Sequence, residues 1–323
     1  MGDPGHLHER LAARLGSARP VAAAAIVSST PGGGFETEVA HVGEGSEGAF
    51  EIGSISKGVT GLLYADAVDR GELAPDATLG DLLPLGHTPA ARVTLASITS
   101  HNSGLPRMPD GQTWRRSWDF MRHGTNPYGD DLATLIEQAR TTKVGSTRHR
   151  YSNLAFELLG HAVAAAAGST YAALVADRIA APLSLDPFYV ATSLDDLRPG
   201  AVAGRTRRGK PRAAWVGEAV GPAGGIRASI ESMAGLTQAL LDGSAPGARA
   251  LTPAVRVGRS SHIGIAWHTM NVRGRDITWH NGGTGGFRSW MGLDREAGRG
   301  AVVLCASAAL VDRIGLELLV SRA

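Results

Sequence analysis

Residues 50–68 of the 323-residue chain read FEIGSISKGVTGLLYADAV, a short apolar run followed by a longer periodic one. The short run ends at Gly53, and apolar residues then recur at the spacing of an α-helix. This pattern predicts a helix over 54–68 that begins at Ser54. Because Ser54 and Lys57 are three residues apart, they share one face of that helix, with the lysine stem beside the serine hydroxyl.

A serine and a lysine in this arrangement can form a nucleophile and its base. A serine hydroxyl is a poor nucleophile unless a base lies within hydrogen-bond reach, and a lysine can serve when its surroundings lower its pKa. The positive end of the helix dipole at Ser54 also favours developing negative charge. In isolation, however, the pair is better explained as a helix N-cap serine and a solvent-exposed lysine.

The rest of the chain divides around residues 72–209, where helical patterns are broken by Pro and Gly and no convincing alternating strands occur. Residues 1–71 and 210–323 are predicted to form an α/β (α+β) subdomain with an antiparallel sheet, and 72–209 a mostly α-helical insertion, together one catalytic unit. The predicted helices are 5–15, 153–167, 170–180, 229–242 and 309–320, and the predicted strands 21–28, 36–42, 262–272, 276–279, 288–293 and 300–306.

Composition excludes several classes of function. Hydrophobic residues make up 43% and charged residues 19%, as in a globular protein, and the net charge of +2 implies no nucleic-acid partner. The single cysteine, Cys305, lies in an apolar run and is predicted to be a buried strand residue. The eleven histidines form no metal-binding pattern, so no metal and no cofactor are predicted.

The protein is also expected to be soluble and cytoplasmic and to have no membrane partner. Its first ten residues are polar and lack the basic and apolar regions of a secretory signal. The alanine-rich runs at 21–27 and 162–167 are shorter than the about 20 apolar residues that span a bilayer. No feature of the sequence predicts an oligomeric state.

Two further motifs follow the Ser-x-x-Lys pair. Tyr151-Ser152-Asn153 precedes a predicted helix, and the stretch 280–287, HNGGTGGF, lies between predicted strands. The order Ser-x-x-Lys, Tyr-x-Asn and Lys/His-x-Gly resembles the serine β-lactamase and penicillin-binding protein superfamily, which includes class C β-lactamases, DD-peptidases and family VIII carboxylesterases. Residues 95–106, which end in Ser-Gly-Leu-Pro, and residues 223–229 look like other family stretches. The resemblance thus covers nearly the whole chain.

The resemblance implies a sheet flanked by helices, an all-α insertion and a site at their junction. Carried over by position, Ser54 would be acylated and Lys57 would take its proton. Tyr151 would relay a proton to the leaving group, and Asn153 would bind an amide or polar group on the acyl side. The backbone N–H groups of Ser54 and Gly283 would form the oxyanion hole, each donor worth about 3 to 4 kcal/mol.

The third motif departs from the pattern of dedicated β-lactamases of this type, which carry Lys and Thr there. Here His280, Asn281 and Gly282 would contribute to substrate binding. A histidine with a pKa of about 6.5 is largely neutral at neutral pH, so it should bind a substrate carboxylate more weakly than lysine does. This argues against efficient penicillin hydrolysis.

Three other residues are weaker candidates for the site. His101, which precedes Ser-Gly-Leu-Pro, is expected to be an accessory residue at most. Trp114 and Trp118 are expected to line a wall or to pack within the insertion, and not to stack on nucleic-acid bases.

Three functions remain open at this point. The first is a serine hydrolase that acts on a small ester or amide through a Ser54 acyl-enzyme. The second is a biosynthetic acyltransferase, which passes the acyl group from a small acyl donor to an amine or alcohol. The third, more distant, is a non-catalytic ligand-binding or sensor domain.

Overall fold

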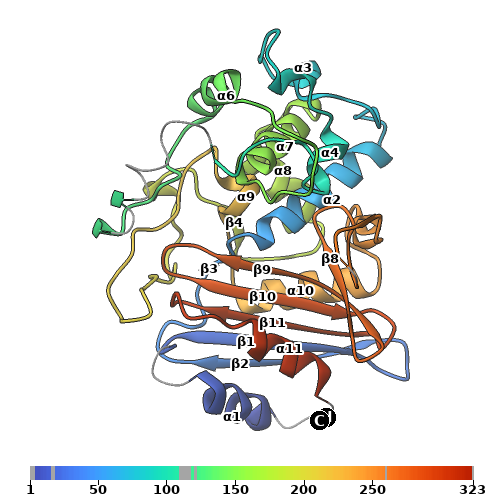
Figure 1. Ribbon diagram of the computed structural model, residues 1–323. Coiled ribbons are helices and arrows are strands. Elements are labelled where there is room, and N and C mark those ends of the chain that lie inside the picture. Colours follow the sequence, from blue (N-terminus) through green and yellow to red (C-terminus); the bar gives the residue numbers. More distant parts are fainter. Residues whose placement is uncertain (1–3, 16–18, 109–117, 120–121, 259, 322–323) are drawn as a thin grey trace.

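The computed structural model describes residues 4–15, 19–108, 118–119, 122–258 and 260–321 (Figure 1). Its centre is an antiparallel sheet with the strand order β2-β1-β11-β10-β9-β8-β7-β6. The strands are β1 (Ala22–Ser29), β2 (Phe35–Val42), β6 (Val255–Arg256), β7 (Ser261–Ile263), β8 (His268–Val272), β9 (Arg275–Gly283), β10 (Arg288–Asp294) and β11 (Arg299–Cys305).

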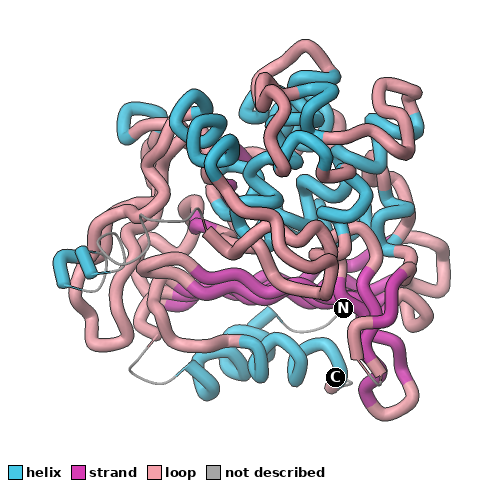
Figure 2. The backbone as a smooth tube through the Cα atoms, turned by 45° about the horizontal axis from the view of Figure 1, so that its top comes forward, coloured by secondary structure: helices cyan, strands magenta, loops and turns pink. Residues whose placement is uncertain are grey.

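Helices cover both faces of this sheet (Figure 2). On one face lie α1 and α11, and on the other lie α10 and the larger helical layer around α2. The helices are α1 (Pro4–Leu15), α2 (Ile55–Asp69), α3 (Leu79–Leu82), α4 (Leu95–Thr99), α6 (Leu132–Thr141), α7 (Asn153–Ala166), α8 (Tyr171–Val175), α9 (Gly221–Gly224), α10 (Ile230–Leu241) and α11 (Asp312–Val320). Short 3₁₀ helices are η1 (Ala90–Arg92), η3 (Leu194–Asp196) and η4 (Ala248–Leu251), and η2 (Ala176–Ala180) is a π-helical turn that continues α8. The predicted antiparallel sheet flanked by helices is confirmed.

The first strand shows why the sheet is covered twice. Every residue from Ala22 to Val27 is at most 2% exposed. Alternate residues of this run belong to two different hydrophobic clusters, one under α1 and α11 and one under α10 and α2. A strand buried on both faces needs a continuous apolar run and not an alternating one, which is the pattern that this sequence has.

Helix α2 is the central element of the helical layer, and it is apolar nearly all round because it is buried on every side. Polar side chains fix its position. The Oγ of Ser56 accepts the backbone N–H of Ile226 at 3.2 Å, and Thr60 donates its hydroxyl to the carbonyl of Pro222 at 2.8 Å. These bonds tie the first turns of α2 to the segment that carries α9 and β5.

The structure corrects three predicted elements. A short strand, β4 (Phe188–Val190), lies within the insertion and pairs in a second sheet of order β3-β5-β4, with β3 at Phe50–Glu51 and β5 at Ile226–Ala228. The strand predicted over 262–272 is two strands, β7 and β8, because the chain bends between them. Strand β9 extends through the third motif to Gly283, which had been placed between strands, because it stays paired with β10 to its end.

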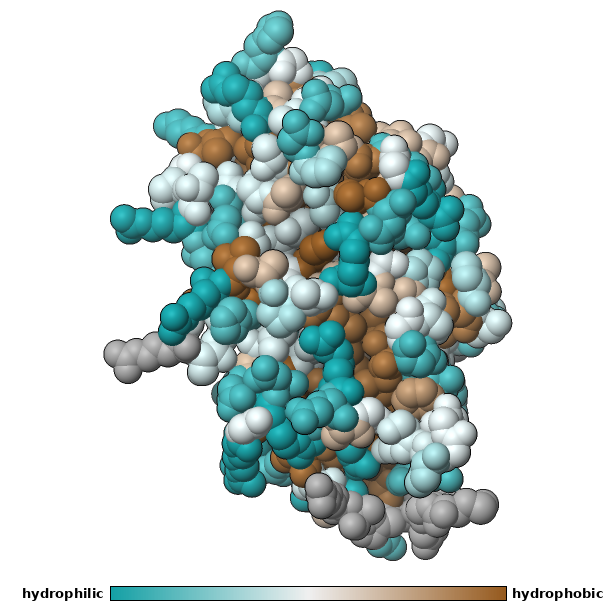
Figure 3. Space-filling model, turned by 90° about the vertical axis from the view of Figure 1, so that its right-hand side faces the viewer, coloured by the Kyte–Doolittle hydropathy of each residue, from teal (hydrophilic) through white to brown (hydrophobic). Residues whose placement is uncertain are grey.

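No single helix in the described ranges is long and apolar enough to cross a membrane; α7 with α8 and η2 meets the criteria of length and composition only as a pair bent by 80°. Hydrophilic side chains cover most of the projecting surface on the face shown in Figure 3. Cys305 is buried on β11, as predicted, and burial raises the pKa of its thiol to about 11.

Candidate active site

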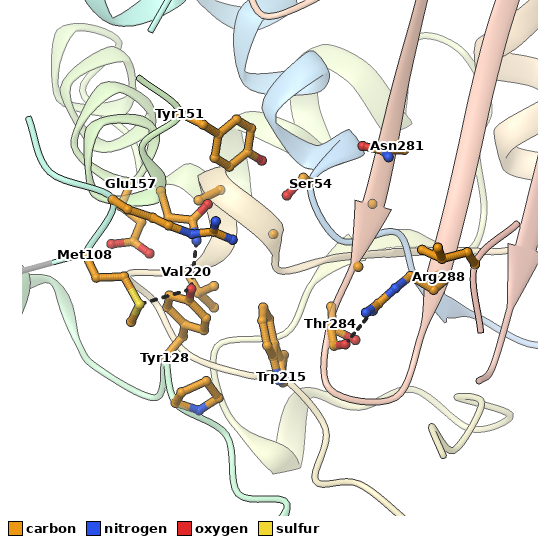
Figure 4. Close-up of a pocket in the computed structure, with 18 of the residues that line it drawn as sticks. Ser54, Met108, Tyr128, Tyr151, Glu157, Trp215, Val220, Asn281, Thr284 and Arg288 are labelled. Carbon is orange, nitrogen blue, oxygen red and sulfur yellow. Dashed lines mark hydrogen bonds between the residues drawn. The ribbon is translucent and has the colours of Figure 1, made fainter. Parts of the chain in front are cut away.

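A pocket of about 570 Å³ lies where the sheet meets the helical layer. Ser54 lies in its wall at the start of α2, and Tyr151 approaches from the segment just before α7 (Figure 4). Asn153, the first residue of α7, also lines the pocket. Asn281 and Gly283, from the end of β9, complete the side that faces the sheet. Three segments that are far apart in the sequence therefore meet at one cavity.

Ser54 and Lys57 form the pair that the sequence predicted. The Nζ of Lys57 lies 3.2 Å from the Oγ of Ser54, within hydrogen-bond distance. Ser54 is at the N-cap position of α2, but its side chain caps no backbone N–H group. The alternative of a capping serine with a solvent-exposed lysine is therefore wrong, because Lys57 is 0% exposed.

The side-chain nitrogen of Lys57 is held by polar and aromatic neighbours. It donates a hydrogen bond to the carbonyl of Ala223 at 2.5 Å, and it lies 4.9 Å from the centroid of the Tyr151 ring and 5.9 Å from that of Phe156. The hydroxyl of Tyr151 points toward Ser54 (Figure 4). Serine, lysine and tyrosine thus converge on one side of the pocket.

His101, only an accessory candidate from the sequence, packs directly against Tyr151. The centroids of the two rings are 4.6 Å apart. The His101 Nδ1 accepts the backbone N–H of Ser152 at 3.3 Å, and its carbonyl accepts that of Arg150 at 2.8 Å, so it holds the residues on both sides of the tyrosine. Burial, together with the charge of Lys57, lowers the pKa of His101 to about 2, so its ring is neutral.

The segment before Ser54 lies close against the end of β9. Gly53 has a φ of +54°, and a Cβ at this position would lie 2.5 Å from the nitrogen of Gly283. A Cβ at Gly282 would lie 2.0 Å from the carbonyl oxygen of Ile52, which accepts a hydrogen bond from the Ser289 hydroxyl at 2.7 Å. Only glycines at 53 and 282 allow this approach, which brings the segment carrying Ser54 beside Gly283.

Asn153 lines the pocket and is held by a residue that the sequence did not indicate. Its Nδ2 donates a hydrogen bond to the hydroxyl of Tyr128 at 2.7 Å. Burial raises the pKa of Tyr128 to about 12, and the charge of Glu157 acts in the same direction. Tyr128 is therefore neutral, and its ring packs against Trp215, whose centroid is 4.7 Å away.

His280 lies elsewhere than expected. Its side chain is 2% exposed and packs against Trp267 and His268, so it does not line the pocket. Side chains alternate along β9, and this places His280 on the covered face while Asn281 reaches the cavity. Burial, with the charge of His268, lowers the pKa of His280 to about 3, so it is neutral.

Asn281 makes a contact that changes the character of this side of the pocket. Its Nδ2 donates to Oδ1 of Asp312, the first residue of α11, at 2.5 Å. Because a carboxylate only accepts hydrogen bonds, the amide oxygen of Asn281 is turned away from Asp312. This part of the wall thus carries a negative charge and an acceptor, where the Lys and Thr of dedicated β-lactamases give a cation and a hydroxyl.

A buried ion pair supports the chain just before Ser54. Glu51 and Arg227 are each 1% exposed in their side chains, and their charged groups are 2.7 Å apart. The same Glu51 oxygen accepts the backbone N–H of Trp215 at 2.8 Å, which positions a further pocket residue. Burial raises the pKa of Glu51, while the charge of Arg227 opposes that shift.

The two tryptophans proposed for a wall do not contribute as expected. Trp118 is 48% exposed, and its ring contacts His123 and Arg122 at the surface, so the expectation that it lines a wall or packs within the insertion is wrong. Trp114 lies outside the described residues. The pocket includes several residues without any local sequence signal, Arg107, Glu157, Trp215 and Asp312, and also Arg288, which directly follows the third motif.

The antiparallel sheet between helices, with a Ser-x-x-Lys pair at the junction, defines the class of the serine β-lactamases and penicillin-binding proteins. The family comparison agrees. The chain belongs to the Beta-lactamase family, whose model matches residues 32–320.

Solved structures of this superfamily match over nearly the whole chain. A β-lactamase from Sulfitobacter sp. EE-36 has a TM-score of 0.77 at 20% identity and covers 96% of this chain and 94% of its own. The D-alanine carboxypeptidase AmpC from Burkholderia cenocepacia has a TM-score of 0.74 at 22% identity, with 94% of each chain covered. At these identities the likeness shows the fold.

Relatives with known names match over shorter lengths. The D-alanyl-D-alanine-carboxypeptidase/endopeptidase AmpH of Escherichia coli (strain K12) is 29% identical over 163 residues, which cover 48% of this chain and 40% of that protein. The unguisins hydrolase ungD' of Aspergillus campestris (strain IBT 28561) is 24% identical over 280 residues, or 76% of this chain and 50% of that protein. The chain therefore spans about half the length of these relatives or less. Its homologues are serine hydrolases.

Proposed function

We propose that this protein is a serine hydrolase that cleaves a small ester or amide through an acyl-enzyme on Ser54. The observation that carries the proposal is the contact of 3.2 Å between the Ser54 Oγ and the buried Nζ of Lys57. The Ser54 side chain caps no backbone N–H group of α2, and Lys57 is buried, so the pair has no evident structural purpose. A serine with a buried lysine within hydrogen-bond distance is the arrangement that an activated nucleophile requires.

In the proposed reaction, Ser54 Oγ attacks the substrate carbonyl carbon while its proton passes to the amine nitrogen of Lys57, which acts as the base. Negative charge develops on the carbonyl oxygen, and the N–H groups of Ser54 and Gly283 stabilise it. Tyr151 relays this proton from Lys57 to the leaving alcohol or amine as the bond between that group and the carbonyl carbon breaks. Water then attacks the acyl-enzyme, one of its protons returns through the same groups to Ser54 Oγ, and Ser54 is released with a carboxylic acid as product.

The charge beside Asn281 supports esters and amides over penicillins as substrates. Asp312 and the amide oxygen of Asn281 are both acceptors, and His280 is buried and neutral. None of these groups attracts a carboxylate at the place where the third motif of dedicated β-lactamases supplies a cation. We therefore expect weak penicillin hydrolysis.

The test is release of 4-nitrophenol from 4-nitrophenyl butyrate by the wild type and by Ser54→Ala. Turnover that is lost in Ser54→Ala supports the proposal, and equal turnover by both proteins contradicts it. An amine added to the same reaction separates hydrolysis from acyl transfer. A carboxylic acid as the main product indicates a hydrolase, and an amide indicates an acyltransferase.

A further inference from the structure

Two opposite charges line the pocket on the side of the sheet, Arg288 of β10 and Asp312 of α11. Within the described ranges, neither forms an ion pair with a protein group at 4.0 Å or less, and the more distant charge of Asp312 only partly offsets the effect of burial, which lowers the pKa of Arg288. A partly buried charge without a partner is unfavourable unless a ligand compensates for it. The two residues are thus candidates for the recognition of charged groups on a substrate.

Arg288 lies immediately beside the proposed oxyanion hole. It is the cross-strand neighbour of Gly283, and a Cβ at Gly283 would lie 2.7 Å from its Nη1. This Nη1 donates to the carbonyl of Thr284 at 2.9 Å (Figure 4) and to that of Phe287 at 2.8 Å. Among the described residues, Nε and Nη2 have no acceptor, so these donors remain for a ligand.

Asp312 gives the pocket an electrostatic direction. Its carboxylate, held by Asn281, repels an anion at that part of the wall. The guanidinium of Arg288 attracts an anion, and its planar set of donors matches the two oxygens of a carboxylate. An anionic group of a bound substrate would therefore lie at Arg288 and away from Asp312.

We propose that Arg288 determines specificity by binding a carboxylate of the substrate, so that the pocket selects esters or amides whose carboxylate reaches Arg288 and not the wall at Asn281 and Asp312, where the third motif of dedicated β-lactamases supplies a cation. This inference rests on the proposed function of Ser54. The simpler role for Arg288 is to hold the turn carbonyls of Thr284 and Phe287. A glutamine can donate to those carbonyls but carries no charge, so Arg288→Gln separates the two roles.

The test uses two matched pairs of esters. Mono-4-nitrophenyl adipate and its methyl ester place the charge on the acyl side, and 4-carboxyphenyl acetate and its methyl ester place it on the leaving group. In at least one pair, Arg288→Gln is expected to lower the ratio of kcat/KM for the acid to that for the methyl ester by about 10-fold to 100-fold. Arg313→Gln is the matched control because its side chain is 92% exposed and outside the pocket. It should leave the ratio unchanged.

A ratio that is the same in wild type and Arg288→Gln for both pairs would overturn the inference, even if the methyl esters are hydrolysed through Ser54. Binding of adipate to Ser54→Ala, measured by calorimetry, gives a second readout that needs no turnover. Adding Arg288→Gln should weaken that binding about tenfold or more. An adipate affinity that is the same with and without Arg288→Gln would contradict the role of Arg288. If the wild type turns over none of the esters but Arg288→Gln still weakens adipate binding, only the proposed function is contradicted.

Discussion

Replacing Gly53 with alanine tests how the pocket is assembled around Ser54. A residue with a side chain at a φ of +54° costs about 1 to 2 kcal/mol of stability. In addition, the new Cβ would lie 2.5 Å from the nitrogen of Gly283, so the end of β9 must move. If that shift removes one oxyanion donor, kcat falls by about 100-fold to 1000-fold.

Gly71→Ala is the control, because Gly71 lies just beyond the other end of α2 with a φ of +73°. A Cβ there meets nothing within 4 Å. Both variants should lose stability in urea unfolding, but only Gly53→Ala should lose turnover of 4-nitrophenyl butyrate. The reasoning is refuted if Gly53→Ala retains kcat within about threefold of wild type.

Three further predictions concern the groups around the site. Arg227→Met should lower the free energy of unfolding by about 3 to 5 kcal/mol, because it leaves Glu51 buried without its partner; adding Glu51→Gln should restore part of the loss in urea titrations. The free energy of unfolding should fall as the pH drops from about 6.5 toward 3, and His280 should contribute up to about 1.4 kcal/mol per pH unit to this fall. The reason is that His280 takes up a proton more readily in the unfolded chain than in the folded one. His280→Asn should flatten that dependence in unfolding curves at several pH values, whereas the same change at exposed His87 should not. His101→Ala should lower kcat for 4-nitrophenyl butyrate more than it raises KM, because Tyr151 loses the ring beside it; an unchanged kcat would assign His101 a purely structural role.

The elements that the sequence predicted well are those with local signals. Helix α7 begins at Asn153 because the Ser152 hydroxyl accepts the backbone N–H of Ala155 at 3.0 Å, a cap that a nearby serine reveals. The apolar run at 21–28 was likewise predicted as a strand, and it forms β1. The spacing of Ser54 and Lys57 placed them on one helix face, and the two later motifs favoured a nucleophile and its base over a capping serine with an exposed lysine.

The elements that the sequence missed depend on partners far along the chain. The three residues of β4 form a strand only because β5 lies beside them. The burial of His280 follows from the length of β9, which pairing with β10 decides and no local pattern shows. The walls formed by Tyr128, Trp215 and Asp312 come from separate segments, and only Arg288, which directly follows the third motif, had a signal that could have been noticed.

The division into a sheet subdomain and an insertion stays a prediction, as do the catalytic roles of the site residues. The geometry supports those roles through the burial of Lys57 and the approach of Gly283 to the segment before Ser54. Hydrolysis and acyl transfer differ in whether water or another nucleophile attacks the acyl-enzyme, whereas a binding domain is acylated once or not at all.

The most direct test of the central claim is the intact mass of the protein after rapid quenching with 4-nitrophenyl butyrate, followed by peptide mapping of any adduct. The wild type should gain the mass of one butyryl group on the peptide that contains Ser54, and Ser54→Ala should gain none. An adduct on another residue, or turnover of the ester by Ser54→Ala at the wild-type rate, would contradict a serine acyl-enzyme at this site.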